Sequence, residues 1–143
     1  MVVKDIMTKD VIAATPDQPL KEIAQLLKEK RISGLPVVSR TGEIIGIITM
    51  KDMLKILDRI YRWKIVQKKF PDVSFSEISE QEKTNSKVRD VMTEQVFTLT
   101  EDQSLDSVME MMFERGLHTI PVVDKLGKIV GIVDKRDLIN ACF

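Results

Sequence analysis

In the first third of the chain, the spacing of apolar and polar positions changes between that of extended segments and that of helices. Residues 11–14 form a short apolar segment, and residues 20–30 then place apolar side chains at the three- and four-residue intervals of a helix. Two apolar runs, residues 34–38 and 44–48, flank a turn that contains a glycine, which predicts a β-hairpin. A second helix is predicted to begin near Met50. The pattern therefore predicts a β-α-β-β-α unit.

This unit occurs twice. Residues 3–54 align with residues 88–139 without a gap, and eighteen of the 52 aligned positions are identical. The identical residues include Asp, Pro and Gly, which influence helix caps, turns and other special backbone geometry. They are Asp17/Asp102, Pro36/Pro121, Gly42/Gly127, Gly46/Gly131 and Asp52/Asp137. Asp17 and Asp102 are predicted to be the N-caps of the first helix in each unit. A unit of roughly 55 residues would bury too little surface alone, so the two α/β (α+β) units are predicted to pack sheet to sheet as a pseudo-twofold pair.

The repeat predicts three segments. Residues 1–57 form the first repeat, residues 58–87 a helix extension and connector, and residues 88–143 the second repeat. An apolar stripe predicts that the helix of the first repeat continues to about Lys69, where a proline follows shortly. The polar stretch 74–86 is predicted to be a connecting loop.

Composition narrows the class of protein. Apolar residues make up 43% of the chain, and Lys plus Arg and Asp plus Glu both number 22, so the net charge is zero. A neutral chain is a poor general binder of nucleic-acid backbones. No apolar run is long enough to span a membrane and the N-terminus lacks a signal-peptide pattern, so we expect a cytoplasmic protein. One cysteine and one histidine cannot build a metal cluster, and no catalytic set or Walker-type loop occurs, which indicates a protein that is not an enzyme.

Two equivalent strand-to-helix junctions carry the candidate chemistry. They are Gly46–Asp52 and Gly131–Asp137. Thr49 with Asp52 has the spacing of a capping box, and Asp134 is a good N-cap, so both junctions have a structural explanation. A helix N-terminus also presents free N–H groups that suit a phosphate, and a carboxylate there can accept both hydroxyls of a ribose. Both interpretations remain open at this point.

Three short motifs occur in the same order in both repeats. In the first repeat they are Met7-Thr8, Gly34-Leu35-Pro36-Val37-Val38 and Gly46–Asp52, and in the second Met92-Thr93, Thr119-Ile120-Pro121-Val122-Val123 and Gly131–Asp137. This arrangement resembles a tandem pair of CBS domains, a Bateman module. The resemblance implies a regulatory module that requires no cofactor and binds an adenosine-containing ligand (AMP, ADP, ATP, S-adenosylmethionine, sometimes NAD) between the repeats. It also implies energy sensing, a disk-like homodimer and a separate regulated protein.

The resemblance assigns site residues to two crevices, of which the first is preferred. There Asp52 would hold the ribose, and Thr49 would help with ribose or phosphate. By similarity to the gamma subunits of AMP-activated protein kinase, His118 and Arg136 would contact the phosphate. Thr119 stands where those subunits have an arginine, so one phosphate contact is missing. The adenine would lie among Ile47, Val96 and Phe97.

The second crevice is expected to be weaker. Asp137 is equivalent to Asp52, but Asp134 replaces the threonine, and a carboxylate that faces a phosphate repels it. Ser33 replaces the histidine, and Lys51 is the basic counterpart of Arg136. The apolar residues would be Val11, Ile12 and Ile132. This crevice is expected to be empty or to prefer a ligand without phosphate.

Other functions remain open. A CBS pair with a degenerate site could be a dimerisation or interaction module without a small ligand, and Tyr61 and Trp63 could dock a partner or simply pack. Nucleic-acid binding is disfavoured, because it rests only on basic positions along the long helix that also fit a solvated face. These positions are Lys51, Lys55, Arg59, Arg62, Lys68 and Lys69. A third group, Met109, Met111 and Met112, is predicted to be helix core and not a soft-metal site.

Overall fold

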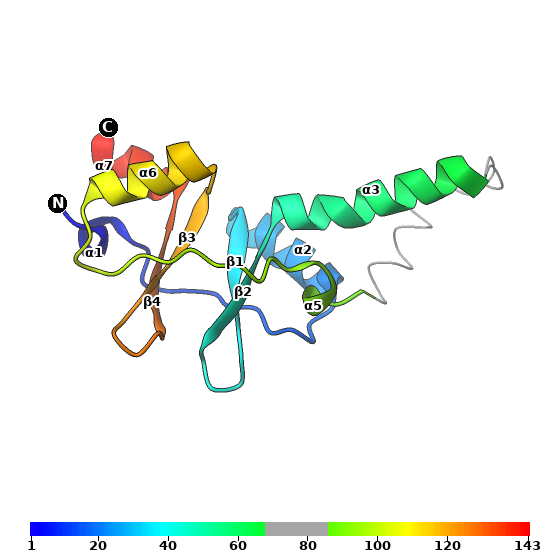
Figure 1. The fold of residues 1–143 in the computed structure, drawn as a ribbon, viewed down its shortest axis with the longest axis horizontal. Helices are drawn as coiled ribbons and strands as arrows, with labels where there is room; N and C mark the ends of the chain where they lie inside the picture. Colours follow the sequence, from blue (N-terminus) through cyan, green and yellow to red (C-terminus); the bar gives the residue numbers. More distant parts are fainter. Residues whose placement is uncertain (68–85) are drawn as a thin grey trace.

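The computed structural model describes residues 1–67 and 86–143. Its helices are α1 (Val3–Ile6), α2 (Leu20–Lys30), α3 (Met50–Gln67), α5 (Val88–Val91), α6 (Leu105–Arg115) and α7 (Lys135–Cys142), and its strands are β1 (Gly34–Val38), β2 (Ile44–Thr49), β3 (Thr119–Val123) and β4 (Ile129–Asp134). Both halves follow the predicted order of helix, hairpin and helix (Figure 1). The predicted helix end at Lys69 and residues 74–85 of the predicted loop lie outside the described residues.

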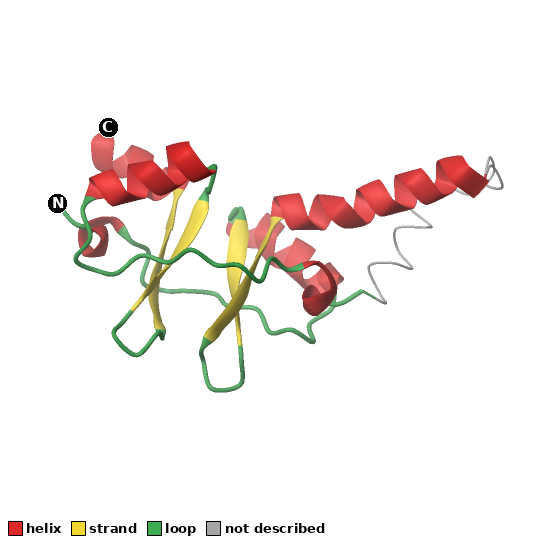
Figure 2. Cartoon of the chain, in the orientation of Figure 1, coloured by secondary structure: helices red, strands yellow, loops and turns green. Residues whose placement is uncertain are grey.

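Each half contains one antiparallel hairpin, as predicted. β1 pairs with β2, with Pro36 opposite Ile47, and β3 pairs with β4, with Pro121 opposite Ile132. The two hairpins share one register and shift it at the same place, near the end of the first strand. Figure 2 shows the hairpins side by side at the centre of the molecule, with helices towards both ends. The predicted pair of small sheets with helices is therefore confirmed.

The predicted strand at residues 11–14 is wrong in extent, as is its counterpart at 96–99. Only Ala14 pairs with β1: its N–H donates to the Pro36 carbonyl at 2.8 Å, and its carbonyl accepts from the Val38 N–H at 2.9 Å. The next bond of a parallel ladder would need an N–H on Pro36, which proline lacks, so pairing stops after one residue. The second half repeats this geometry with Leu99, Pro121 and Val123.

The N-caps of the first long helix in each half differ from the prediction. They are Pro19 for α2 and Ser104 for α6, and neither side chain makes a cap hydrogen bond. Asp17 and Asp102 lie two positions earlier, too far from the second and third helical N–H groups to cap them. Asp17 instead forms an ion pair with Arg89 of the other half. The identical aspartates therefore lie in the turn before the helix and not at its cap.

The short N-terminal helix of each half packs on the other half. The N–H of Val3 in α1 donates to the Gln103 carbonyl at 2.8 Å, and the Val3 side chain is buried in the core of the second half. In return, the N–H of Val88 in α5 donates to the Gln18 carbonyl at 3.0 Å, and Val88 is buried in the core of the first half. Figure 1 shows α1 near α6 and α7, and α5 near α2. Packing thus crosses the predicted segment boundaries, which stay a prediction.

Two apolar cores hold the hairpins. Leu20, Ile23, Leu35 and Ile48 are almost fully buried in the first core, and Leu99, Val108, Ile120 and Val133 in the second. Met112 belongs to the second core, and Met109 and Met111 pack against it, so these methionines are structural as predicted. Each core contains a strand residue next to one strand-to-helix junction, Ile48 in the first core and Val133 in the second, and so helps to hold that junction in place.

Candidate functional site

The Met-Thr segments connect each junction to the other half. Thr8 exchanges two backbone hydrogen bonds with Ile132 in β4, at 2.8 and 2.9 Å, and Thr93 makes the equivalent pair with β2. The Thr8 hydroxyl then donates to Asp137 at 3.0 Å, and the Thr93 hydroxyl donates to Asp52 at 2.9 Å. Each junction aspartate therefore accepts a hydrogen bond from the threonine of the other half's Met-Thr segment.

Glycine allows a close approach where these segments cross the strands. A Cβ on Gly131 would lie 2.5 Å from the Met7 sulfur and 3.2 Å from the Thr8 carbonyl oxygen. A Cβ on Gly46 would meet the equivalent atoms of the second Met-Thr segment at 2.9 and 3.1 Å. A side chain at either position would force the methionine to move and would press against the threonine carbonyl, which explains why the glycine and the Met-Thr motif recur together.

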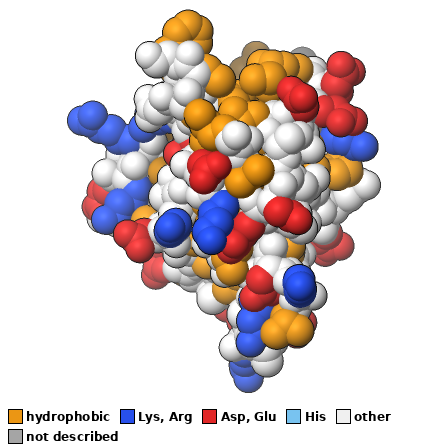
Figure 3. Space-filling model, turned by 90° about the vertical axis from the view of Figure 1, so that its left-hand side faces the viewer, with side chains coloured by type: hydrophobic (Ala, Val, Ile, Leu, Met, Phe, Trp, Pro, Cys, Tyr) orange, Lys and Arg blue, Asp and Glu red, His pale blue; other side chains and the backbone are white. Residues whose placement is uncertain are grey.

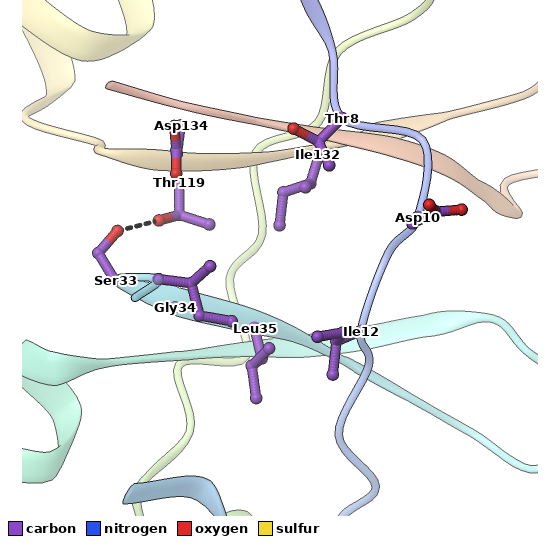
Figure 4. A pocket seen from close by; sticks show the side chains of 10 residues that line it. Thr8, Asp10, Ile12, Ser33, Gly34, Leu35, Thr119, Ile132 and Asp134 are labelled. Carbon is purple, nitrogen blue, oxygen red and sulfur yellow. Dashed lines mark hydrogen bonds between the residues drawn. The ribbon is translucent and has the colours of Figure 1, made fainter. Parts of the chain in front are cut away.

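A cavity of about 70 Å³ opens between the halves at the second crevice. Its walls come from the segment after α1, from the start of β1 and from β3 and β4 (Figure 4). The lining residues are Thr8, Asp10, Ile12, Ile32, Ser33, Gly34, Leu35, Thr119, Ile132 and Asp134. The cavity combines an apolar wall with hydroxyls and carboxylates, which is the composition of a small-molecule site.

The two halves meet at one end of this cavity through a pair of hydroxyls. Ser33 Oγ and Thr119 Oγ1 lie 2.7 Å apart and share a hydrogen bond (Figure 4). Thr119 is 6% exposed and Ser33 is half-buried, so this bond is partly shielded from water. It fixes the start of β1 against the start of β3, close to the pseudo-twofold axis.

Asp52, in the first crevice, is saturated by partners within the chain. The residue is 3% exposed, and its carboxylate accepts from the Thr49 N–H at 2.9 Å, the Thr49 hydroxyl at 3.2 Å, the Lys55 ammonium at 2.8 Å and the Thr93 hydroxyl at 2.9 Å. The capping box predicted for Thr49 and Asp52 is present, with the return bond from the Asp52 N–H at 3.4 Å. A ligand hydroxyl that reaches Asp52 must therefore replace one of these partners.

Asp137, in the second crevice, is less enclosed. One of its oxygens accepts from the Asp134 N–H at 2.9 Å, and the other accepts from the Thr8 hydroxyl. Asp134 is the predicted N-cap of α7, and its Oδ1 accepts from the N–H groups of Arg136 and Asp137 at 2.8 and 3.0 Å. Partial burial raises the pKa of Asp137, and the nearby charge of Asp134 adds to the rise, while the hydrogen bonds from the Asp134 N–H and the Thr8 hydroxyl oppose it.

The residues predicted for the preferred crevice are only partly brought together. Ile47, Val96 and Phe97 are half-buried, and the Arg115 guanidinium lies over the Phe97 ring, 4.5 Å from its centre. His118 and Arg136 are exposed. Their side chains make no hydrogen bond to Thr49 or Asp52 in the part of the chain that the structure describes. Thr119, assigned to this crevice, lines the other one.

Some of the residues predicted for the second crevice line the cavity, and others do not. Ile12, Ser33, Ile132 and Asp134 line the cavity, whereas Val11, Lys51 and Asp137 do not. Sequence reasoning missed five lining residues: Thr8, Asp10, Ile32, Gly34 and Leu35. Thr8, Gly34 and Leu35 belong to the repeated motifs, so a signal for them existed. Asp10 and Ile32 fall between motifs and carried no signal.

Residues 1–67 and 86–143 contain no group of three His, Cys, Asp or Glu side chains placed to hold a metal ion. Within the same ranges, no helix combines the length and the apolar character needed to cross a bilayer.

Comparison with known proteins identifies the family. The model of the CBS domain matches residues 3–59 and 88–143, which together cover most of the chain. The chain belongs to the CBS domain family. The two matches correspond to the two repeats, and the resemblance to a tandem CBS pair is confirmed. CBS domain pairs are generally regulatory modules.

Relatives in Methanocaldococcus jannaschii share the pair. Protein MJ1426 is 31% identical over 99% of this chain and 90% of its own length. The crystal structure of MJ1225 has a TM-score of 0.78 and 31% identity, and the match covers 99% of this chain but 48% of that chain. The CBS domain pair of protein MJ0100, solved in complex with 5′-methylthioadenosine and S-adenosyl-L-methionine, has a TM-score of 0.75 and 29% identity and is covered over 100% of both chains. The match therefore covers nearly all of one relative and about half of another.

Proposed function

We propose that this CBS pair is a regulatory module that binds an adenosine-containing ligand between its halves and controls a separate partner protein. The observation that carries the proposal is the cavity between the halves, with apolar walls from both repeats and hydroxyls at its ends. The pair from MJ0100, which has the same fold at 29% identity, was solved with two adenosine-containing ligands. AMP, ADP, ATP and S-adenosylmethionine are the candidate ligands.

The first crevice remains the proposed nucleotide site. A ribose hydroxyl would replace the Lys55 ammonium or the Thr93 hydroxyl at Asp52, since the carboxylate already accepts four hydrogen bonds. The adenine would pack among Ile47, Val96 and Phe97. The exposed side chains of His118 and Arg136 are available to a phosphate at the N-terminus of α3.

A ligand titration tests this function. Calorimetry and thermal-shift assays with AMP, ADP, ATP, S-adenosylmethionine and NAD should show at least one binder, and a ligand at one hundred times its Kd stabilises the fold by about 2.7 kcal/mol. Asp52→Asn should weaken nucleotide binding more than Asp137→Asn, its matched counterpart. If no ligand shifts the transition of protein shown to be ligand-free, the proposed function fails.

The second candidate function is a dimerisation module, and the surface of α3 favours it. One face of α3 carries an exposed apolar stripe at helical spacing, while Ile56 and Ile60 face the core. The stripe consists of Met50, Leu54, Leu57, Tyr61 and Ile65, which are 51%, 59%, 37%, 57% and 54% exposed. Further apolar surface gathers at the end of the molecule that carries α6 and α7 (Figure 3). Ile139 in α7 is the counterpart of Leu54 and is 55% exposed.

Solution mass tests the homodimer. The wild type should have twice the chain mass of 16.3 kDa in light scattering. Leu54→Glu and Ile139→Glu should shift it towards the monomer, because a buried unpaired charge opposes association. Leu126→Glu, in the turn between β3 and β4, is the control, since Leu126 is 79% exposed and lies outside the helical stripe. A monomeric wild type would exclude the dimer and leave the ligand-binding proposal in place.

Nucleic-acid binding gains no support from α3. Two of its basic side chains pair with acidic residues of the same helix, Lys55 with Asp52 at 2.8 Å and Arg62 with Asp58 at 3.0 Å. These ion pairs neutralise part of the positive charge along α3, on which the hypothesis of nucleic-acid binding rested. Together with a net charge of zero, they favour a solvated helix face.

A further inference from the structure

The cavity in the second crevice is lined by acidic and not by basic side chains. Asp134 contributes a half-buried carboxylate, and Thr8, Ser33 and Thr119 contribute hydroxyls, whereas the carboxylate of the exposed Asp10 points away from Ile12 and Ile132 (Figure 4). The remaining lining residues are apolar or glycine, so none of the ten is lysine, arginine or histidine. A ligand phosphate placed in this cavity would face like charge without a compensating cation.

The helix that begins at this cavity has no free position for an anion. The N–H groups of Arg136 and Asp137 already donate to the Asp134 carboxylate at 2.8 and 3.0 Å, and the N–H of Lys135 donates to the His118 carbonyl at 3.2 Å. The Asp134 carboxylate thus occupies the place that a phosphate takes at other helix N-termini. The chain supplies its own anion here.

The equivalent helix in the first half is built differently. Thr49 caps α3 with a neutral hydroxyl, and its bond from the Asp52 N–H is longer, at 3.4 Å. The N-terminus of α3 therefore keeps its attraction for an external anion, whereas the negative charge of Asp134 cancels that attraction at α7. One substitution between the repeats, threonine against aspartate, separates the two crevices in charge.

The rest of the cavity suits an uncharged nucleoside. Ile12 and Ile132 come from opposite halves and present apolar surface to the space between them (Figure 4). The hydroxyls of Thr8, Ser33 and Thr119 can donate or accept, and the carboxylate of Asp134 accepts hydrogen bonds. These groups match the apolar face of a base and the hydroxyls of a ribose, and the carboxylate also tolerates a cationic substituent.

From this arrangement we infer that the second crevice selects phosphate-free nucleosides, neutral or cationic, and that Asp134 excludes nucleotides from it. This inference rests on the proposed function, because it assigns a ligand class to one of the two crevices. The module then responds separately to two chemical classes. A nucleotide acts at the Asp52 crevice, and a phosphate-free nucleoside acts at the Asp134 crevice.

Methyl NMR of the full chain tests the inference, because isoleucines report on each crevice separately. Ile12 and Ile132 report on the second crevice, and Ile47 reports on the first. In the wild type, adenosine and 5′-methylthioadenosine should shift Ile12 and Ile132 with a Kd at least about tenfold lower than that of AMP.

Two variants of Asp134 isolate the role of its charge. Asp134→Thr reproduces the residue of the first junction, and Asp134→Asn keeps an oxygen acceptor for the cap while it removes the charge. Either variant should tighten AMP binding at Ile12 and Ile132 by about tenfold and change adenosine binding by less than about threefold. Asp124→Asn is the control: it removes one charge in the turn between β3 and β4, where Asp124 accepts from Leu126 and Lys128, and should leave the AMP-to-adenosine ratio unchanged.

The outcomes separate this inference from the proposed function. If AMP binds at Ile12 and Ile132 as tightly as adenosine in the wild type, or if both Asp134 variants keep the wild-type ratio, phosphate exclusion is wrong and ligand binding still stands. If none of the three compounds, nor any ligand of the titration above, shifts Ile12, Ile132 or Ile47, the proposed function and this inference both fail.

Discussion

Removal of the Thr93 hydroxyl should weaken the fold more than removal of its counterpart on Thr8. Thr93 Oγ1 donates to Asp52 at 2.9 Å, and Asp52 is only 3% exposed. Thr93→Val keeps the branched shape but removes the donor to a buried carboxylate. Hydrogen bonds to charged groups contribute about 1.5–3 kcal/mol. Thr93 itself is exposed and water can approach, so we expect the lower end of this range, about 1.5 kcal/mol.

The matched control is Thr8→Val. It removes the 3.0 Å bond to Asp137, which lies in a more exposed setting, so we expect a cost of about 0.5 kcal/mol. For a chain of this size each kcal/mol lowers Tm by about 3–4 °C, so Thr93→Val should lower Tm by about 5 °C and Thr8→Val by about 2 °C. Thermal and urea unfolding followed by circular dichroism measure both variants. A double-mutant cycle with Asp52→Asn isolates the coupling.

Two results would refute this reasoning. One is an equal loss of stability in both threonine variants, which would show that the burial of Asp52 has no effect on the strength of its bond. The other is a coupling energy between Thr93 and Asp52 below about 0.5 kcal/mol, which is the usual error of additivity. Either result would mean that the apolar side chains and the backbone hydrogen bonds of the Met-Thr segment alone keep it in place.

Three further predictions concern stability. Gly131→Ala should cost about 1–3 kcal/mol in urea unfolding, because its Cβ would lie 2.5 Å from the Met7 sulfur, and an unchanged midpoint would contradict the clash. Ile23→Ala should cost about 2–5 kcal/mol in the same assay, because Ile23 is fully buried, and a cost below about 1 kcal/mol would show a site that collapses freely. Burial raises the pKa of Asp137 above its ordinary value of 3.8. Between pH 3.8 and the folded-state pKa, Asp137 is therefore more protonated in the native state than in the unfolded chain. The free energy of unfolding falls as pH rises through this window. Urea unfolding across this window should show that fall in the wild type and not in Asp137→Asn, and equal slopes would contradict the shift.

Local structure followed from the sequence because local rules decide it. The two hairpins lie where apolar runs flank a turn with glycine, and Gly42 and Gly127 adopt the positive φ angles of 83° and 79° that such turns favour. The capping interactions of Thr49 and Asp134 follow from residue type and spacing within four positions. The two hairpins share one register, in keeping with the repeated sequence pattern.

Other features depend on which segments meet, and the repeat obscures this. Residues 3–6 and 88–91 are so similar that their apolar pattern fits either core, yet each packs on the opposite half. Spacing likewise placed Asp17 at a cap, whereas the fold pairs it with Arg89 of the other half. The single-residue bridge at Ala14 depends on the missing N–H of a proline in the neighbouring strand, not on the apolar character of residues 11–14.

The candidate site divides in the same way. The sequence by itself determined the two junctions, the aspartates within them and the replacement of Thr49 by Asp134, because these are properties of residue type at repeated positions. Only the tertiary structure decided that Asp52 is buried among four donors and that the cavity opens beside Asp134. Burial and cavities arise from side chains that are distant along the chain, so a pattern of apolar and polar positions predicts which residues can form a site but not which of them are left accessible to a ligand.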